Sequence, residues 1–173
     1  ASPRKYNTVH EDTNILFGGG IDDMFLNTDT GQFHVVDYKS TAVSKFERRD
    51  EVNLDGIYKQ GYKRQMDMYV WIGKQKGLPM SDIAYFLYVD GQSCDETGKP
   101  YDGMFLDQHS PQLKFQPTLI PYEADDSWVE PTLFHIKELL ESETQPQHSE
   151  GCEFGAYLDQ VAYATSATAF LRG

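Results

Sequence analysis

Residues 15–39 read ILFGGGIDDMFLNTDTGQFHVVDYK. The two ends of this stretch, 15–26 and 33–39, are rich in Ile, Phe, Val, Met and Tyr, whereas its centre, 27–31, consists of residues that favour turns. The pattern predicts a β-hairpin. Both predicted strands carry apolar residues on both faces over much of their length, which is typical of central strands covered on two sides.

The register of this hairpin decides which charged side chains meet. If the turn pairs Asn27 with Gln32, Asp22 faces Asp37 directly across the two strands. Side chains alternate along a strand, so Lys39 projects from the same face as Asp37. The sequence therefore predicts that three charged groups converge at one place.

Two opposed carboxylates have β-carbons roughly 5 Å apart, a like-charge contact that destabilises a sheet unless something compensates. Mg²⁺ would compensate, since it prefers oxygen ligands and uses only one or two carboxylates. Asp22 and Asp37 are the expected ligands. Asp23 points to the opposite face and is the second choice, because a one-residue slip would exchange the two. The alternative is a set of ordinary polar residues near strand ends, with Lys39 paired to a carboxylate.

The remaining sequence predicts helices and further strands. Apolar residues recur at helical spacing over 62–76, and the runs 83–89 and 113–122 are typical of strands. Ser127, with Glu130 three residues later, predicts a capping box that opens a helix through Leu140. A last helix follows the break at 145–149, and 40–61 is expected to be a loop or flap. The order indicates an α+β fold, a mixed sheet with helices packed on it.

Composition and charge limit the classes of function. The chain has 173 residues and a net charge of -12, which is unusual for a nucleic-acid binder. However, nine of the 15 Lys and Arg fall within residues 39–76. Next to a metal site, this segment indicates a strip that faces phosphates; alone, it would indicate a solvated surface. The candidate nucleic-acid contacts are Ser40, Lys45, Arg48, Arg49, Lys63 and Arg64.

The sequence also bears on compartment. No apolar run approaches the roughly 18 residues that a membrane span needs, and the first residues lack the apolar stretch of a secretory signal. Cys94 and Cys152 lie far apart in polar surroundings, which predicts no disulfide framework. We therefore expect a soluble protein of the cytoplasm.

Three motifs in order carry a resemblance to a known family: GIDDM at 20–24, VVDYKS at 35–40 and QMDMY at 65–69. They resemble the Gly-x-x-Asp, apolar-Asp-Tyr-Lys and Gln-x-x-x-Tyr series of RecB-like nucleases in the PD-(D/E)XK superfamily. The resemblance covers residues 18–90 well, and the rest only through the order of elements.

The resemblance implies a restriction-endonuclease-like core and hydrolysis of DNA phosphodiester bonds, as an exonuclease in recombination, repair or phage DNA metabolism. It implies Mg²⁺ or Mn²⁺ bound by Asp22, Asp37 and the peptide carbonyl of Tyr38, and it makes Lys39 catalytic. Gln65 and Tyr69, one helical turn apart on one face, would support the site and contact DNA.

The chain departs from the family pattern in two places. Relatives supply a further His or Glu ligand from an earlier helix, for which His10 and Glu11 are the nearby candidates. We therefore expect residues 1–173 to be a single nuclease-like domain that lacks an N-terminal helical part. Near the other end, the segment from Cys152 resembles a Cys-x-x-Cys-x-Tyr element with Gly155 in place of the second cysteine. We expect no iron–sulfur cluster, and Cys152 packed under the last helix.

Two other functions are compatible with the same residues. The first is a non-catalytic DNA-binding or assembly module of the same fold, in which the acidic half from Gly77 onward could meet a protein partner in a recombination or repair complex. The second is a metal-dependent hydrolase of another phosphoester. A phosphate-binding loop, a dinucleotide fingerprint, a zinc-ligand cluster and a serine-nucleophile elbow are absent from the sequence.

Overall fold

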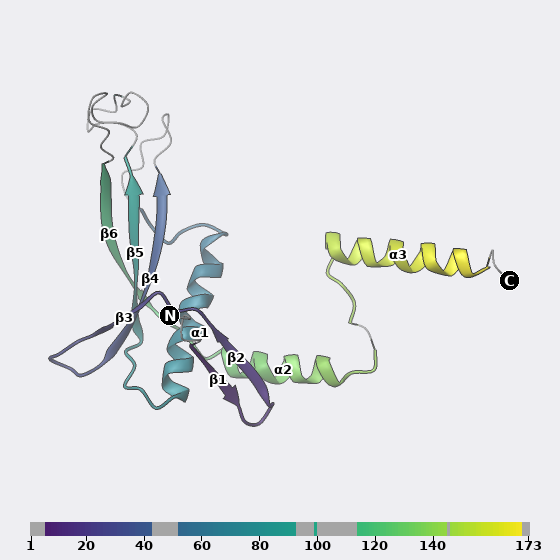
Figure 1. Ribbon diagram of the computed structural model, residues 1–173, viewed down its shortest axis with the longest axis horizontal. Helices are drawn as coiled ribbons and strands as arrows, with labels where there is room; N and C mark the ends of the chain where they lie inside the picture. Colours follow the sequence, from purple (N-terminus) through teal and green to yellow (C-terminus); the bar gives the residue numbers. More distant parts are fainter. Residues whose placement is uncertain (1–5, 43–51, 93–98, 100–113, 145, 171–173) are drawn as a thin grey trace, which may run out of the picture. The chain divides into compact units, whose positions relative to one another are not determined.

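The computed structural model describes residues 6–42, 52–92, 99, 114–144 and 146–170, the side chains of 166–170 excepted. It is an α+β structure with a four-stranded mixed sheet flanked by helices (Figure 1). In chain order the elements are β1 (Tyr6–His10), β2 (Ile15–Gly19), β3 (Asp23–Leu26), β4 (Phe33–Ala42), α1 (Lys59–Gln75), β5 (Ile83–Gly91), β6 (Phe115–Glu123), α2 (Val129–Glu141) and α3 (Glu153–Phe170).

The predicted hairpin is formed by β3 and β4, with the predicted register. Leu26 pairs with Phe33 and Asp23 with Val36, and the Asn27 amide donates to the Gln32 carbonyl at 2.9 Å. The Asn27 side chain accepts two amide hydrogens within the turn, which closes with a glycine at φ 72°. The turn chemistry and the two-residue period of the strands thus fix the same pairing.

The stretch 15–26 is not one central strand, as the sequence suggested. β2 ends at Gly19, and β3 begins only at Asp23 and lies at the edge of the sheet, whose order is β3-β4-β5-β6. The side chains of Phe25 and Leu26 are about half exposed, at 44% and 51%. Consecutive side chains point to opposite faces, so β3 leaves apolar surface exposed on both faces here, whereas the apolar composition had indicated burial on two sides.

β1 and β2 form a separate two-stranded antiparallel sheet that the sequence did not indicate. This hairpin packs on α1, where the ring of Phe17 meets Trp71 edge to face at 5.8 Å and the Tyr6 hydroxyl donates to the Tyr69 carbonyl at 3.0 Å. β1 escaped notice because its buried residues, Tyr6 and His10, are aromatic or polar, whereas its Val9 is half exposed. The face of β1 that packs on the protein thus includes a polar residue, and its aliphatic Val9 points toward solvent.

α1 connects two parallel strands, β4 and β5, which need a long crossover. The helix begins three residues before the predicted 62–76 and ends where Gly77 adopts φ 72°. There the Gly77 amide donates to the Lys74 carbonyl and the Leu78 amide to the Gly73 carbonyl, which is a Schellman termination. The helix buries Met66, Val70 and Ile72 completely against Val35, Ala84 and Phe86 of the sheet.

β5 and β6 correspond to the strands predicted at 83–89 and 113–122. They pair antiparallel, and α2 follows them in the chain. α2 begins at Val129, and its Val129 and Leu133 enter the core. The predicted capping box does not form: the Ser127 hydroxyl donates to the Asp125 carboxylate at 2.6 Å. The Ser127 amide donates to Asp125 at 3.1 Å and the Glu130 carboxylate lies at His10, so the two groups that the box would join have other partners.

The chain divides into two compact units, Ala1–Phe134 and His135–Gly173. The second contains α3, which Cys152 precedes: the Cys152 carbonyl accepts the Ala156 amide at 3.0 Å. A Cβ at Gly155 would lie 2.1 Å from the His148 ring, so a small residue is required there. The absence of an iron–sulfur cluster stays a prediction. No helix within the described ranges is both long enough and apolar enough to cross a bilayer.

Candidate active site

Asp22, Asp37 and Lys39 come together as the register requires. Asp37 and Lys39 lie two residues apart on β4 and project from its α1 side, with Val35. Asp22 lies in the loop immediately before β3, where its Oδ2 accepts the backbone amide of Tyr38 at 2.9 Å. The hairpin therefore places a second carboxylate beside Asp37.

Asp37 is the buried centre of this group. Its side chain is 3% exposed, and the Lys39 ammonium makes an ionic contact with its Oδ2. Burial raises the pKa of Asp37, the lysine opposes the rise, and the neighbouring Asp22 carboxylate adds to it. The Lys39 ammonium already partners this oxygen, so a cation bound here would share Oδ2 with the lysine or displace it.

Asp23, the second choice for a ligand, is held on the other side of the hairpin. Its carboxylate accepts the Tyr38 hydroxyl at 2.6 Å and the Met24 amide at 2.7 Å. The Tyr38 hydroxyl, followed by the Met24 amide, lowers the pKa of Asp23. The geometry therefore groups Asp22, and not Asp23, with Asp37.

The side chains of Gln65 and Tyr69 meet each other and reach the loop that carries Asp22. The Gln65 amide donates to the Tyr69 hydroxyl at 2.8 Å, and that hydroxyl donates to the Gly20 carbonyl at 2.5 Å. Gly20 lies two residues before Asp22, so this chain of hydrogen bonds fixes the backbone that presents the carboxylate. The two residues act as positioning groups in this arrangement.

Two lysines near the site lie over aromatic rings that no sequence pattern had assigned to it. The Lys39 ammonium lies 4.4 Å from the centre of the Tyr62 ring, and Lys59 lies 5.2 Å from the Tyr88 ring. Such contacts favour the charged ammonium over a ring face. Tyr62 is seven residues before Tyr69, a helical spacing that could have indicated a shared face.

A line of polar groups continues from Lys39 across the sheet. Lys39 pairs with Tyr88 and Thr41 with Asp90 in the parallel register of β4 and β5, so these side chains share one face. Within the described residues, the buried side-chain atoms without a hydrogen bond are Asp37 Oδ2, Tyr88 OH and Asp90 Oδ1. Asp90 also lines a groove with Gln92, Gln116 and Thr118. Unsatisfied buried groups gathered on one face are a mark of functional surfaces.

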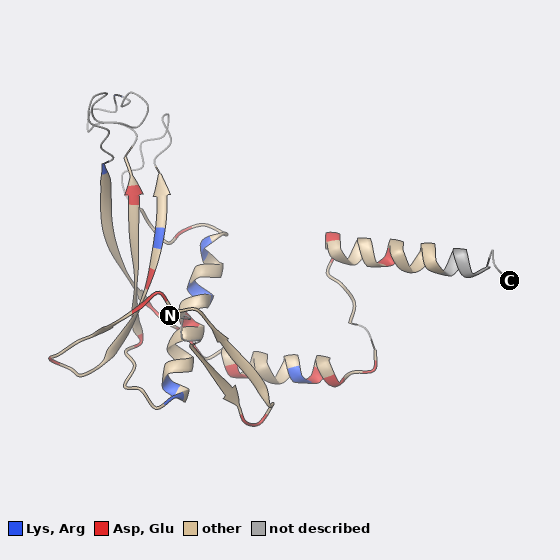
Figure 2. Cartoon of the chain, in the orientation of Figure 1, with Lys and Arg blue, Asp and Glu red and all other residues tan. Residues whose placement is uncertain are grey.

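Of the six residues predicted to contact nucleic acid, the structure describes three, and these lie on two different elements. Lys45, Arg48 and Arg49 lie outside the described residues. Ser40 is exposed on the face of β4 opposite Lys39, since the two are consecutive. Lys63, which is half buried, and the exposed Arg64 lie on α1, and Arg64 lines a shallow depression with Trp128 and Thr132. Figure 2 shows basic residues on β4 and along α1.

Asp67, inside the Gln-x-x-x-Tyr motif, joins three elements, and the sequence analysis did not single it out. It is 4% exposed, and its carboxylate accepts the Tyr122 hydroxyl, the Asp125 amide and the Trp128 indole N–H at 2.9, 3.0 and 2.9 Å. This carboxylate ties α1 to β6 and to the start of α2. An acidic residue among apolar neighbours on a helix was the only signal available.

The two candidates for an upstream ligand do not take part in the Asp22–Asp37–Lys39 cluster. His10 contacts Thr13, Glu130 and the rings of Trp71 and Phe134. Glu11 lies exposed in the turn after β1. Position in the chain suggested these residues as ligands, but the β1–β2 hairpin directs His10 toward the start of α2.

The described cluster thus offers two adjacent carboxylates, one of them buried, and a lysine held by that buried carboxylate and an aromatic ring. This donor set is suited to a divalent cation with oxygen ligands and to an anionic substrate. No protein-family model, no curated protein and no solved structure matches the chain, so the conclusions about its site depend on this geometry.

Proposed function

We propose that this protein is a divalent-metal-dependent nuclease that hydrolyses DNA phosphodiester bonds, with a restriction-endonuclease-like core. The observation that carries the proposal is the β3–β4 register, which brings Asp22 to Asp37 and sets Lys39 on the same face. Burying the Asp37 carboxylate beside a second carboxylate costs folding free energy, and perturbed groups of this kind gather at sites that bind ions or substrates.

The residues present fit Mg²⁺ or Mn²⁺. Asp22 and Asp37 supply carboxylate oxygens, and at the buried Oδ2 of Asp37 a cation would join or replace the Lys39 ammonium. The peptide carbonyl of Tyr38 is the third candidate ligand. A cation would also favour the ionised form of Asp37, whose pKa is raised by burial first and by the neighbouring Asp22 carboxylate second. When bound, such an ion polarises the scissile phosphate and lowers the pKa of a coordinated water.

Lys39 has the main role among the residues that do not hold the ion. Its ammonium, held between Asp37 and the Tyr62 ring, presents fixed positive charge to a phosphate oxygen and can orient an attacking water. Gln65 and Tyr69 position the Asp22 loop through the Gly20 carbonyl. Small errors in this placement would reduce the rate, because the ligands must be held in one geometry.

The second candidate is a non-catalytic module of the same fold that binds DNA or a protein partner. The acidic residues beyond Gly77 favour a protein partner in this case, since phosphate would be repelled there. This candidate predicts an intact cluster with no turnover, so an assay of cleavage separates the two.

The test is degradation of end-labelled linear duplex and single-stranded DNA by the purified chain with Mg²⁺ or Mn²⁺, beside Asp37→Asn and Lys39→Ala. Asp29→Asn is the matched control, because Asp29 is an exposed carboxylate in the turn of the same hairpin. We expect cleavage by the wild type and the control only, with Mg²⁺ binding by calorimetry retained in Lys39→Ala and lost in Asp37→Asn.

Metal binding and DNA binding without cleavage would replace the nuclease with the non-catalytic module. Hydrolysis of bis-(p-nitrophenyl) phosphate without degradation of DNA would indicate a different phosphoester substrate. Cleavage that survives in Asp37→Asn would remove this cluster from the mechanism.

A further inference from the structure

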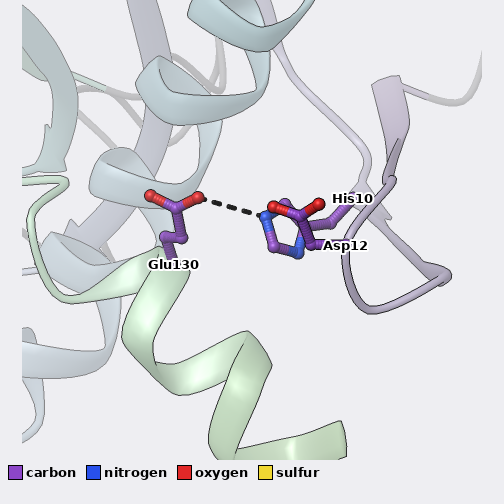
Figure 3. Close-up of side chains that lie close together, drawn as sticks. All are labelled: His10, Asp12 and Glu130. Carbon is purple, nitrogen blue, oxygen red and sulfur yellow. Dashed lines mark hydrogen bonds and ion pairs between the residues drawn. The ribbon is translucent and has the colours of Figure 1, made fainter.

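A second group of potential metal ligands lies away from the candidate active site. It consists of His10 at the end of β1, Asp12 in the following turn and Glu130 in the first turn of α2 (Figure 3). One ligand atom from each lies within 4.8 Å of those of the other two. All three residues belong to the first compact unit.

The imidazole of His10 is buried and held in one orientation. The residue is 7% exposed, and its ring lies 5.9 Å from the Trp71 ring and 5.4 Å from the Phe134 ring. Its Nδ1 is 2.9 Å from the hydroxyl oxygen of Thr13, and its Nε2 is 3.2 Å from the Glu130 carboxylate. The carboxylates of Asp12 and Glu130 are exposed, so an ion can reach the group from solvent.

Thr13 is the hydrogen-bond partner of the His10 Nδ1. The Thr13 hydroxyl, in a residue only 2% exposed, lies 2.9 Å from Nδ1 and 3.4 Å from the carbonyl oxygen of His10. When the hydroxyl donates to that carbonyl it accepts a hydrogen from Nδ1, and Nε2 is then the nitrogen with the free lone pair. Metal-binding histidines are held in this way, with one nitrogen donating to a protein oxygen and the other free to coordinate.

In this tautomer the lone pair of Nε2 is directed at the Glu130 carboxylate. A lone pair and a carboxylate oxygen 3.2 Å apart repel each other unless a positive group lies between them. That group is either a second proton on the imidazole or a metal ion. Asp12 supplies a second carboxylate at the same place, which one imidazole proton does not need but a dication would use.

We propose that His10, Asp12 and Glu130 form a site for a first-row transition-metal dication, with Zn²⁺ as the reference ion. Imidazole nitrogen is a ligand for Zn²⁺, whereas Mg²⁺ requires hard oxygen ligands. The three residues come from β1, its turn and α2, so the ion joins the N-terminal hairpin to α2. Three protein ligands leave at least one position for water.

The experiment is calorimetric titration of Zn²⁺ into the full chain carrying Asp37→Asn, which disables the candidate active site, with excess Mg²⁺ present. We expect one Zn²⁺ per chain. Asp12→Asn and Glu130→Gln should each weaken binding by at least tenfold, on the scale of lost metal-site contacts. Because both side chains are exposed, these variants should keep the fold, which thermal melting by circular dichroism checks.

His135→Asn is the matched control, since His135 is an exposed histidine 3.7 Å from Glu138 on α2 and tests adventitious binding by a surface pair. Its Zn²⁺ affinity should equal that of the parent. No Zn²⁺ binding by the parent, or binding that neither Asp12→Asn nor Glu130→Gln weakens, overturns the proposal and leaves His10 as a hydrogen-bond partner of Glu130. Because Asp37 is replaced throughout, either result is independent of DNA cleavage.

Discussion

Asp67→Asn tests whether one buried carboxylate holds α1 to β6 and α2. In the wild type, Oδ1 accepts the Tyr122 hydroxyl and the Asp125 amide, and Oδ2 accepts the Trp128 indole N–H. Asparagine has the same shape but only one acceptor oxygen. If that oxygen replaces Oδ1, the new amide nitrogen faces the Trp128 N–H, and two donors meet.

The cost follows from the three hydrogen bonds. Two lose the charge of their acceptor, at about 1 kcal/mol each, and the indole N–H is left buried without an acceptor, at about 1–3 kcal/mol. Relief from burying a charge offsets part of this sum. We expect a net loss of about 3 kcal/mol in the free energy of unfolding, which lowers Tm by about 6–12 °C for a chain of this size.

Urea unfolding followed by fluorescence measures this loss, with Asp82→Asn as the control. Asp82 is an exposed carboxylate paired with Lys74, and removing such a pair costs about 0–1 kcal/mol. Trp128→Phe should make Asp67→Asn milder, because the opposing N–H is gone, and the double-mutant cycle should give a coupling of about 1–3 kcal/mol. A loss no larger than that of the control, or a coupling near zero, would refute the reasoning.

Three further predictions concern the same helix and strand. Tyr69→Phe removes the hydroxyl that holds the loop before β3, so Mn²⁺ affinity by calorimetry should fall about 10-fold or more with little change in Tm; unchanged affinity would deny it a positioning role. Burial, and then the neighbouring carboxylate, raise the pKa of Asp37, so its ionisation costs folding free energy. The stability of the wild type relative to Asp37→Asn should therefore fall as pH rises from the ordinary aspartate pKa of about 4 through the raised folded pKa, and urea titrations showing a constant difference would contradict this. Gly73→Ala places a Cβ 2.5 Å from Met80 and should destabilise by about 1–3 kcal/mol, whereas Gly61→Ala in the same helix meets nothing within 4 Å and should stabilise by about 0.5–1 kcal/mol; equal melting temperatures would disprove the packing argument.

The local parts of the fold were predictable because short-range chemistry encodes them. The 27–32 turn and the two-residue period of its flanking strands gave the β3–β4 register, and helical spacing gave most of α1. The edge position of β3 was not predictable, because apolar composition does not report which neighbour a strand has. β1 was missed because the residue it buries at its end is the polar His10.

In the candidate site, too, the sequence predicted the contacts that depend on strand register and missed those that depend on tertiary packing. The proximity of Asp22 to Asp37 depends on register alone, and the sequence predicted it. Asp67 and Tyr88 depend on which elements pack against them, so no spacing within the chain identified either residue. The Asp12–Glu130 approach joins residues more than a hundred positions apart, which only the tertiary structure brings together.

The hydrogen bond from the Tyr38 backbone amide to Asp22 has an evolutionary consequence. Its donor belongs to the main chain, so every amino acid except proline can supply it at position 38. The side chain at that position faces away from Asp37 and can change without disturbing the anchor. Homologues could therefore carry other residues at position 38 and still hold the Asp22 carboxylate in place. Such a change would remove only the hydrogen bond from the Tyr38 hydroxyl to Asp23.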